Sequence, residues 1–481
     1  MIAGQAAAEL DALLGERISS APSILDLHGR DESRFLPRRP EAVAFPRSTE
    51  EVSRILAICG RDGVPVIPWG AGSSLEGHVL PVAGGLTVDL SGMDRIVEVN
   101  AEDLDCRVQA GVGRLALEKA LGQDGLFFAV DPGADATLGG MAATAASGTR
   151  TTRYGTMREN VLGLEVVLAD GTVVQTGTRA RKSSAGYDLT RLMLGSEGTL
   201  GVITELTLRI HGIPEQIAAA RCVFADLGGL VATVTEAVQL GIPLARCELL
   251  DAAAIRAVNA HAGLEEPEAP TLFLEFHGGP QSVAEQVESV KELAAANGGG
   301  AFAWTATTDE RNRLWRARHN AYFAVTAARA GGVGIRTQTT DVCVPVSRLA
   351  ECIAETAEDA RDLPFPAALV GHVADGNFHW ICPVDVESES EQAALREFVD
   401  RMVARALAAG GTCTGEHGIG IGKREYLLDQ AGAAAVRTMQ ALKQALDPAG
   451  ILNPGKVLPD QLNGAGSTKK SGSSVSPSAA R

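Results

Sequence analysis

The spacing of apolar residues divides the first part of the chain into short helices and strands. Residues 48–51 (STEE) have the pattern of a capping box, which predicts that a helix begins there. The apolar runs at residues 64–67 and 86–90 predict two buried strands separated by a glycine-rich loop. The apolar face of the predicted helix is made by Val52, Ile55, Leu56 and Cys59.

A hairpin and a further strand follow in the same part of the chain. Residues 161–168 and 172–175 are strand-like and flank Asp170-Gly171, a pair typical of tight turns between antiparallel strands. Residues 198–210 then lead into an alternating strand. The chain up to about residue 214 is therefore predicted to form one α+β unit.

The pattern changes after residue 217, where strands alternate with longer helices. This alternation predicts a second α/β layer with an antiparallel or mixed sheet. A last helix at residues 433–446 and the segment 447–456 are expected to return the chain to the first domain. The strands are predicted near residues 218–224, 246–250, 271–277 and 302–306, and the helices near residues 230–239, 252–261 and 282–296.

Two histidines lie on either side of an Asp-Gly pair in residues 371–379 (GHVADGNFH). If Asp375 and Gly376 form a two-residue hairpin turn, His372 faces His379 across the ladder. Their Cβ atoms would then be roughly 5 Å apart, near enough for both rings to bind one metal ion. The alternative is that both are ordinary surface or core histidines.

The segment GEHG at residues 415–418 offers the rest of a catalytic metal site. Glu416 could supply an oxygen ligand to complete a set of two imidazoles and one carboxylate, a set that leaves positions open for a substrate. His417 beside it would be free to act as a base, and an ordinary imidazole pKa of about 6.5 suits that role. The alternative is that His417 is itself a ligand and that His372 or His379 is structural.

Composition narrows the class of protein. With 481 residues, of which 45% are apolar and 21% charged, we expect a soluble globular protein of two or more domains. The formal net charge of −16 argues against a nucleic-acid partner. No apolar run is long enough for a transmembrane segment, and residues 1–14 lack the pattern of a secretory signal. The eight cysteines are scattered and favour reduced thiols in the cytoplasm, with peripheral attachment to the inner membrane left open.

A glycine-rich loop at residues 68–77 (PWGAGSSLEG) presents successive backbone N–H groups without bulky side chains. Such a loop suits a diphosphate, whose charge needs several converging donors. The glycine spacing differs from that of a Rossmann fingerprint, and a simple tight turn is the alternative. The residues that would form the cradle are Gly70, Ala71, Gly72, Ser73 and Ser74.

Further segments resemble a known family. Residues 131–141, 146–148 and 153–155 resemble the flavin-contacting stretches of the vanillyl-alcohol oxidase superfamily. Within it, the resemblance is to the FAD-linked 2-hydroxy-acid dehydrogenases, in particular those of the cytochrome-type D-lactate dehydrogenase group. It covers about residues 35 to 460. It is also carried, in order, by residues 182–190, 195–201, 371–379, 415–418 and 453–456.

The resemblance implies an α+β fold with a PCMH-type FAD-binding domain and a substrate (cap) domain with a mainly antiparallel sheet. The diphosphate of FAD would lie on residues 70–74. Covalently flavinylated relatives carry a histidine where this chain has Ser73, so non-covalent FAD is expected, and His78 is displaced from that position. The other residues expected to line the flavin are Pro132, Thr137, Gly139, Gly140, Ser147, Gly148, Gly155 and Ile203.

Five segments are expected from the patterns and the resemblance together. They are an N-terminal helical segment (1–34), the FAD-binding domain (35–214), the cap domain with the metal site (215–430), a helix returning to the FAD domain (431–460) and a disordered tail (461–481).

The resemblance also implies an arginine that binds the substrate carboxylate, within residues 314–319 (LWRARH). Matching by position favours Arg318, with Arg316 as the second choice. A guanidinium fork suits a planar carboxylate. A pair of surface arginines on a helix is the alternative. Residues 339–342 would form a neighbouring wall of the substrate site.

The expected reaction is oxidation of a small D-2-hydroxy acid, with D-lactate to pyruvate favoured. His417 would take the hydroxyl proton beside a divalent metal, Zn²⁺ or Mn²⁺ ahead of Fe²⁺, and electrons would pass from FAD to cytochrome c or a quinone. D-2-hydroxyglutarate and glycolate dehydrogenases of the same family are alternatives. So is a non-catalytic flavin-binding subunit. A homodimer is one arrangement that the sequence leaves open.

Overall fold

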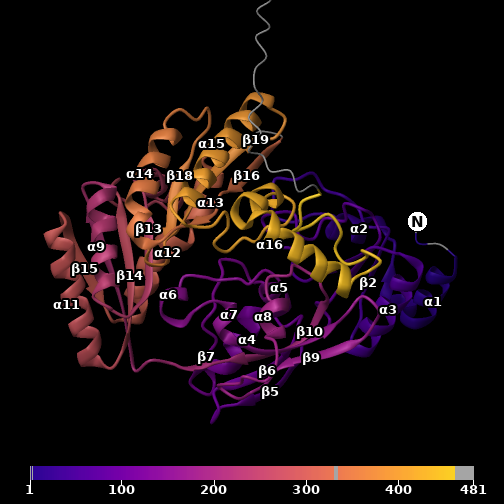
Figure 1. The fold of residues 1–481 in the computed structure, drawn as a ribbon. Helices are drawn as coiled ribbons and strands as arrows, with labels where there is room; N and C mark the ends of the chain where they lie inside the picture. The colour runs from indigo at the N-terminus through magenta and orange to yellow at the C-terminus, as the bar shows by residue number, and fades with distance from the viewer. Residues whose placement is uncertain (1, 3, 330–333, 461–481) are drawn as a thin grey trace, which may run out of the picture.

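The computed structural model describes residue 2 and residues 4–329 and 334–460. Figure 1 shows two α+β halves, with the N-terminal half in indigo and magenta and the larger sheet of the second half running from pink to orange. The predicted tail at residues 461–481 lies outside the described residues. No helix among the described residues is both long and apolar enough to cross a membrane.

The N-terminal half contains a small sheet and a larger antiparallel one. The four-stranded sheet has the order β1 (Ile18–Ser19), β2 (Ala42–Ala44), β4 (Leu86–Asp89) and β3 (Val66–Trp69). The antiparallel five-stranded sheet has the order β5 (Ile96–Asn100), β6 (Asp105–Gln109), β10 (Val202–Arg209), β8 (Val161–Val167) and β9 (Val173–Gly177). A two-stranded piece pairs β7 (Leu126–Phe127) with β11 (His211–Gly212).

The predicted helix α3 (Thr49–Asp62) forms because its N-cap and its apolar face agree. The Ser48 hydroxyl accepts the backbone N–H of Glu51, while the Glu51 carboxylate accepts from Arg17 and from the backbone N–H of Arg47. The capping box is therefore only half formed. The other helices of this half are α1 (Gly4–Leu14), η1 (Gly15–Arg17), α2 (Pro22–His28), α4 (Arg114–Gly122), α5 (Leu138–Ala143), α6 (Thr151–Tyr154), α7 (Met157–Asn160) and α8 (Leu189–Met193).

The second half is built on an eight-stranded sheet whose pairings are antiparallel. Of the two predicted sheet types, antiparallel and mixed, the structure has the antiparallel one. Its main path runs in the order β15 (Gly299–Thr305), β12 (Gln216–Phe224), β14 (Thr271–Gly278), β13 (Leu244–Leu250), β18 (Ala368–His372), β19 (Asn377–Asp385) and β16 (Ile335–Thr339), and β17 (Val342–Cys343) also pairs with β19.

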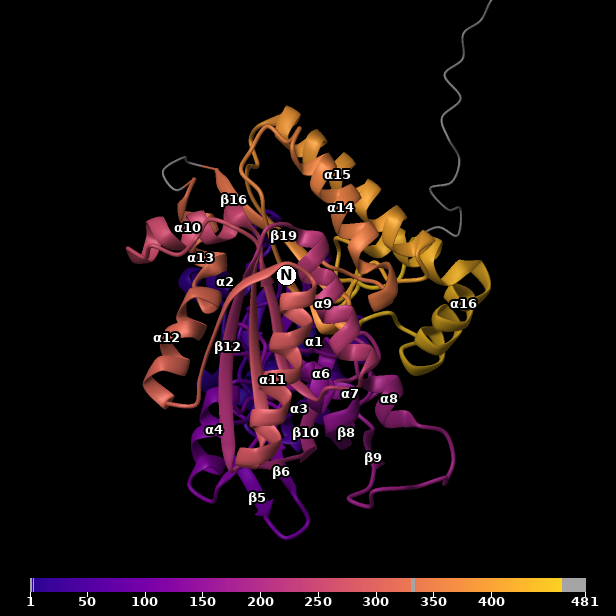
Figure 2. The same cartoon turned by 90° about the vertical axis from the view of Figure 1, so that its left-hand side faces the viewer.

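Helices cover both faces of this sheet (Figure 2). Successive residues of β13 enter different cores, Leu249 packing on one face and Leu250 on the other. On the Leu249 face lie α9 (Leu227–Gln239), α11 (Pro280–Ala296), α14 (Leu349–Ala360) and α15 (Glu389–Ala408). On the Leu250 face lie α10 (Ala252–Ala262), α12 (Thr308–His319) and α13 (Ala321–Ala327). A short turn, η2 (Val346–Arg348), precedes α14.

Residues 451–453 lie against the N-terminal half. Helix α16 (Arg424–Leu446) begins earlier than expected and is interrupted at Gly432, which has a φ of 75°. After it, the backbone N–H of Val66 donates to Ile451 O, and that of Asn453 donates to Val66 O. Ile451 therefore lies in the core of the first half.

The histidine hairpin forms, but its turn is longer than the two residues predicted. A turn of 3₁₀ helix, η3 (Val373–Asp375), and Gly376 with a φ of 78° connect β18 to β19. Val373 has 0% exposure and the backbone N–H of Val344 donates to Gly376 O, so tertiary contacts hold the longer turn in place. His372 consequently pairs with Asn377, and His379 with Val370. The shift is an even number of residues, so both histidines still lie on one face, as diagonal neighbours.

Candidate active site

A cavity of about 970 Å³ lies between the two halves. This volume is at the upper end of the range usual for ligand sites. Twelve of the residues expected to contact the flavin line it, namely Gly70, Ala71, Gly72, Ser73, Ser74, Pro132, Thr137, Gly139, Gly140, Ser147, Gly148 and Ile203. From the other side the lining includes Arg318, His372, His379, Glu416 and His417.

Gly155, the remaining residue expected at the flavin, does not line the cavity. It ends α6 with a φ of 78°, and a Cβ there would lie 2.7 Å from the Cβ of Glu159. Its conformation and its close packing therefore explain the glycine. In the cavity wall, a Cβ on Gly139 would lie 2.6 Å from the Cβ of Ala110, so α5 packs closely against the backbone at the cavity.

Three predicted metal ligands converge on one point of the cavity. One ligand atom each from His372, His379 and Glu416 lies within 4.8 Å of the others. Glu416 Oε1 lies 3.4 Å from His372 Nε2 and 3.2 Å from His379 Nε2. The His379 Nδ1 is hydrogen-bonded to Thr340 O at 2.8 Å, while its buried Nε2 has no hydrogen-bond partner among the described residues. An imidazole held in this way directs its free nitrogen at a cation, so the donor set fits a divalent metal.

The charges at this cluster favour an ionised Glu416 and a protonated His372, so a metal would have to displace the His372 proton. Burial disfavours a charged His372, but the carboxylates of Glu248 and Glu416 outweigh it and hold the pKa of His372 well above its usual value. Burial likewise disfavours a charged Glu416, yet His372 and His379 hold the pKa of Glu416 well below its usual value. The site therefore keeps the Glu416 carboxylate ionised, as a metal ligand must be.

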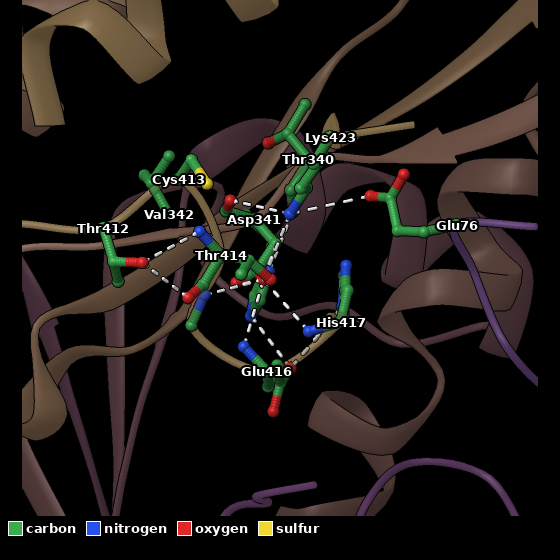
Figure 3. Close-up of polar contacts among 12 residues, drawn as sticks. Glu76, Thr340, Asp341, Val342, Thr412, Cys413, Thr414, Glu416, His417 and Lys423 are labelled. Atoms are coloured by element: carbon green, nitrogen blue, oxygen red, sulfur yellow. Dashed lines mark hydrogen bonds and ion pairs between the residues drawn. The ribbon is translucent and has the colours of Figure 1, made fainter. Parts of the chain in front are cut away.

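The loop that carries Glu416 is fixed by a buried carboxylate (Figure 3). Asp341 Oδ2 accepts the backbone N–H groups of residues 415–417 at 2.8–3.0 Å and the Thr414 hydroxyl at 2.7 Å. Lys423 Nζ lies 3.3 Å from the same oxygen and 3.6 Å from Glu76 Oε1. Burial would raise the pKa of Asp341, but Lys423 is the main cause of its lowering. Asp341 is therefore an ionised anchor for this loop.

His417 stands beside the cluster with a free nitrogen. Its ring stacks on that of His379 with centroids 5.0 Å apart and an interplanar angle of 17°. Its Nε2 lies 3.6 Å from Glu416 Oε1, and its Nδ1 has no hydrogen-bond partner among the described residues. Burial lowers the pKa of His417 to about 4, in place of the ordinary value expected from sequence. The ring is therefore neutral at neutral pH, but this low pKa makes it a weaker base than an imidazole with the ordinary value.

The two candidate arginines differ in position. Arg318 lines the cavity, whereas Arg316 is exposed. Arg318 Nε donates to Glu248 Oε2 at 2.7 Å, and Glu248 Oε1 lies 2.6 Å from His372 Nδ1. The cavity therefore presents a guanidinium and the metal-ligand cluster side by side, joined by one carboxylate.

The cluster also touches the flavin side of the cavity directly. The Ser147 hydroxyl donates to Glu416 Oε2 at 2.9 Å. The backbone N–H groups of Ile419 and Gly420 donate to Glu197 at 2.7 and 2.8 Å, and Glu197 Oε2 lies 3.2 Å from His78 Nε2. The loop that bears Glu416 is thus held from both halves of the protein.

Sequence reasoning missed Glu248, the role of Asp341 and a third arginine, Arg246, which also lines the cavity. One signal for Glu248 was available, since it is a charged residue in the apolar strand 244–250, all of whose residues are buried. A buried charge of this kind needs a partner.

Two family models match the chain at these same regions. The model described as FAD binding domain matches residues 40–177, which hold the glycine-rich segments of the cavity. The model described as FAD linked oxidases, C-terminal domain, matches residues 213–457, which hold Arg318, the two histidines of the hairpin and Glu416. The chain therefore contains an FAD-binding domain.

Related proteins match over nearly the whole chain. A probable mitochondrial D-lactate dehydrogenase of Danio rerio is 48% identical over 446 residues, which are 92% of this chain and 89% of the relative. A mitochondrial D-lactate dehydrogenase (cytochrome) of Arabidopsis thaliana is 42% identical over 456 residues, which are 94% of this chain and 80% of the relative.

The expectation of a cytoplasmic location is wrong by this comparison, because both relatives are named as mitochondrial. It rested on scattered cysteines and on a missing secretory signal. Neither feature distinguishes one reducing compartment from another, so neither could separate the cytoplasm from the mitochondrion.

A solved structure of p-cresol methylhydroxylase with substrate bound has the same fold, with a TM-score of 0.77 over 94% of this chain and 96% of that chain. At 18% identity this likeness concerns the fold alone. It confirms the predicted α+β class, with a PCMH-type FAD-binding domain and a cap domain. The chain is a member of the FAD-linked oxidase family, related over most of its length to the D-lactate dehydrogenases.

Proposed function

We propose that the protein is an FAD-dependent dehydrogenase that oxidises a small D-2-hydroxy acid, with D-lactate to pyruvate as the favoured reaction. Electrons then pass to an external acceptor such as cytochrome c or a quinone. The observation that carries this proposal is the convergence of Arg318, the cluster of His372, His379 and Glu416, and His417 on one cavity with the glycine-rich segments. The relatives named as D-lactate dehydrogenases support the choice of substrate.

Each residue has a separate task in this proposal. Arg318 binds the substrate carboxylate, because a guanidinium forms paired hydrogen bonds with a planar anion. His417 accepts the proton of the substrate hydroxyl, and its largely buried ring is poised for this in the neutral form. FAD, when bound, supplies the oxidant that takes the hydride from the hydroxyl-bearing carbon, so that the hydroxy acid leaves as the oxo acid.

His372, His379 and Glu416 would hold a divalent metal, whose positive charge favours loss of the hydroxyl proton. Two imidazoles and a carboxylate suit Zn²⁺, Mn²⁺ or Fe²⁺, and we propose Zn²⁺ or Mn²⁺ ahead of Fe²⁺. The alternative is that His417 is a ligand and not the base, with His372 structural, since Asp341, His379 and His417 also offer ligand atoms within 4.8 Å of one another. The many donors to Asp341 favour a structural role for that carboxylate instead.

FAD is proposed to be non-covalent. Ser73 lines the cavity at the place where covalently bound relatives carry a histidine, and His78 lies against Glu197. We further propose the FAD-binding domain at 35–214, the cap at 215–430 and the returning segment at 431–460. The separate apolar cores support the first two domains, and Ile451 and Leu452 join the first core, whereas Val436 of α16 packs in the second.

Substrate choice is tested by turnover of a panel of D-2-hydroxy acids with an artificial electron acceptor and with cytochrome c. D-lactate should give the highest kcat/KM. A preference for D-2-hydroxyglutarate or glycolate would move the assignment to those dehydrogenases of the same family. A yellow protein that no hydroxy acid reduces would instead be a flavin-binding subunit without catalysis.

A further inference from the structure

We propose that Glu248 is a positioning residue that couples substrate binding to metal binding, by holding Arg318 and His372 at a fixed spacing. The inference rests on the proposed function, because it assigns substrate to Arg318 and metal to His372. Glu248 itself would touch neither ligand.

The contacts of Glu248 are divided between the two sites. Glu248 has 0% exposure and lies on β13, directly opposite His372 on the neighbouring strand β18. Its Oε1 lies 2.6 Å from His372 Nδ1, and its Oε2 accepts from Arg318 Nε at 2.7 Å. Each oxygen of one carboxylate therefore holds one partner, so a shift of the carboxylate moves both.

Arg318 depends on this contact for its orientation. It comes from α12, whereas His372 comes from the sheet, so no short stretch of chain connects them. Among the described residues, the Arg318 guanidinium has one hydrogen-bond acceptor, Glu248. Because the bond uses Nε, the two terminal nitrogens stay available for a ligand carboxylate.

His372 depends on Glu248 for the direction of its lone pair. With Nδ1 bonded to the carboxylate, Nε2 is the nitrogen that faces Glu416 Oε1, 3.4 Å away. A carboxylate partner of this kind fixes the tautomer and the ring plane of a metal-binding imidazole, and its loss typically weakens metal binding about 10–100-fold.

The chemistry of the substrate explains why one residue should serve both. In a 2-hydroxy acid the carboxylate and the hydroxyl-bearing carbon are joined by a single bond, so the guanidinium and the metal must stand at one spacing. Catalytic constellations tolerate errors of only about 0.5 Å. One rigid carboxylate that contacts both Arg318 and His372 fixes their spacing better than two independent contacts would.

The test compares Glu248→Gln with the matched control Glu391→Gln. Glu391 also pairs with an arginine, Arg329, at 2.7 Å, but on α15 and outside the cavity. Binding is measured on the flavin-loaded protein after metal removal: Co²⁺ by its absorption bands, and pyruvate, without metal, by its perturbation of the flavin spectrum. We expect Glu248→Gln to weaken Co²⁺ about 10–100-fold and pyruvate about tenfold or more, while the control matches wild type.

The possible results separate the coupling from other roles. Loss of Co²⁺ affinity with unchanged pyruvate affinity, or the reverse, overturns the coupling and leaves a role in one site. A lower melting temperature with both affinities unchanged overturns it too. A wild-type protein that binds neither Co²⁺ nor pyruvate overturns the proposed function itself, whereas wild-type binding of both with an unaffected variant overturns the coupling alone.

Glu248→Asp provides a second variant in case the glutamine protein does not fold. It keeps the buried charge but shortens the side chain by one methylene, so it should weaken both affinities in the same direction. A double-mutant cycle with Arg318→Gln completes the test, because the effect of Arg318→Gln on Co²⁺ affinity should shrink when Glu248 is already replaced. Strictly additive effects would contradict the coupling.

Discussion

Replacing His417 by asparagine removes the proposed base while leaving its surroundings in place. The Asp341 contact to residue 417 uses the backbone N–H, at 3.0 Å, so the substitution does not disturb it. Ser147 still donates to Glu416, and both hairpin histidines keep their partners. The variant should therefore fold, bind FAD and bind metal like the wild type.

The expected loss is in the chemical step. General-base catalysis typically contributes 10²–10⁴-fold, which corresponds to about 3–5 kcal/mol of activation free energy. The stacked ring of His417, 5.0 Å from His379 between centroids, carries an Nδ1 without a hydrogen-bond partner among the described residues. With a metal in place, no other described residue of the cluster would offer a free imidazole nitrogen, so we expect the loss to fall within this range.

Stopped-flow measurement of flavin reduction by D-lactate, with metal content determined on the same sample, checks this prediction. Slow reduction with full metal occupancy supports His417 as the base. Slow reduction with loss of metal would make His417 a ligand. Reduction at the wild-type rate would refute both roles.

The remaining predictions concern the metal ligand Glu416, the substrate-binding Arg318, the contact of Arg246 between the two halves, and removal of the metal. Glu416→Ala should remove the metal and most activity but keep FAD, as checked by metal analysis and the flavin spectrum; full metal occupancy would exclude it as a ligand. Arg318→Gln should raise KM strongly, since breaking one side of a buried charge pair costs about 3–5 kcal/mol, and an unchanged KM would exclude it as the anchor. Arg246→Ala breaks the pair with Asp131 at 2.9 Å and should lower the free energy of unfolding by about 3–5 kcal/mol, measured in urea; no change would mean that the pair is screened by solvent. A chelator should abolish turnover and added Zn²⁺ or Mn²⁺ should restore it, whereas full activity after verified metal removal would contradict the metal site.

Local signals predicted local structure well. The helix at α3 could be predicted because its N-cap and four apolar residues of one face all agree, and those apolar residues have 0% exposure. The hairpin at residues 368–385 was predictable for the same reason. Its register was not, because tertiary contacts of the longer turn, among them the hydrogen bond from Val344 N–H to Gly376 O, outweigh the local preference of Asp-Gly.

The supports of the site were beyond sequence reasoning for a different reason. Glu248 meets His372 across 124 positions of sequence, and Asp341 meets the loop of His417 across 76. A charged residue in an apolar strand indicates that a partner is needed, but not which residue it is. The partner depends on strand order in the sheet. The lowered pKa of His417 follows from burial and was equally hidden. The convergence of His372, His379 and Glu416 could be predicted from motifs, whereas the residues that orient them required the fold.

Anaerobic addition of D-lactate to the metal-loaded yellow protein tests whether this cavity oxidises a D-2-hydroxy acid. The flavin absorbance should bleach within the time of a turnover, one pyruvate should form for each flavin reduced, and L-lactate should have little effect. A flavin that stays oxidised in the presence of D-lactate, with metal and FAD both shown to be bound, would contradict the assignment of this cavity as a D-2-hydroxy-acid dehydrogenase site.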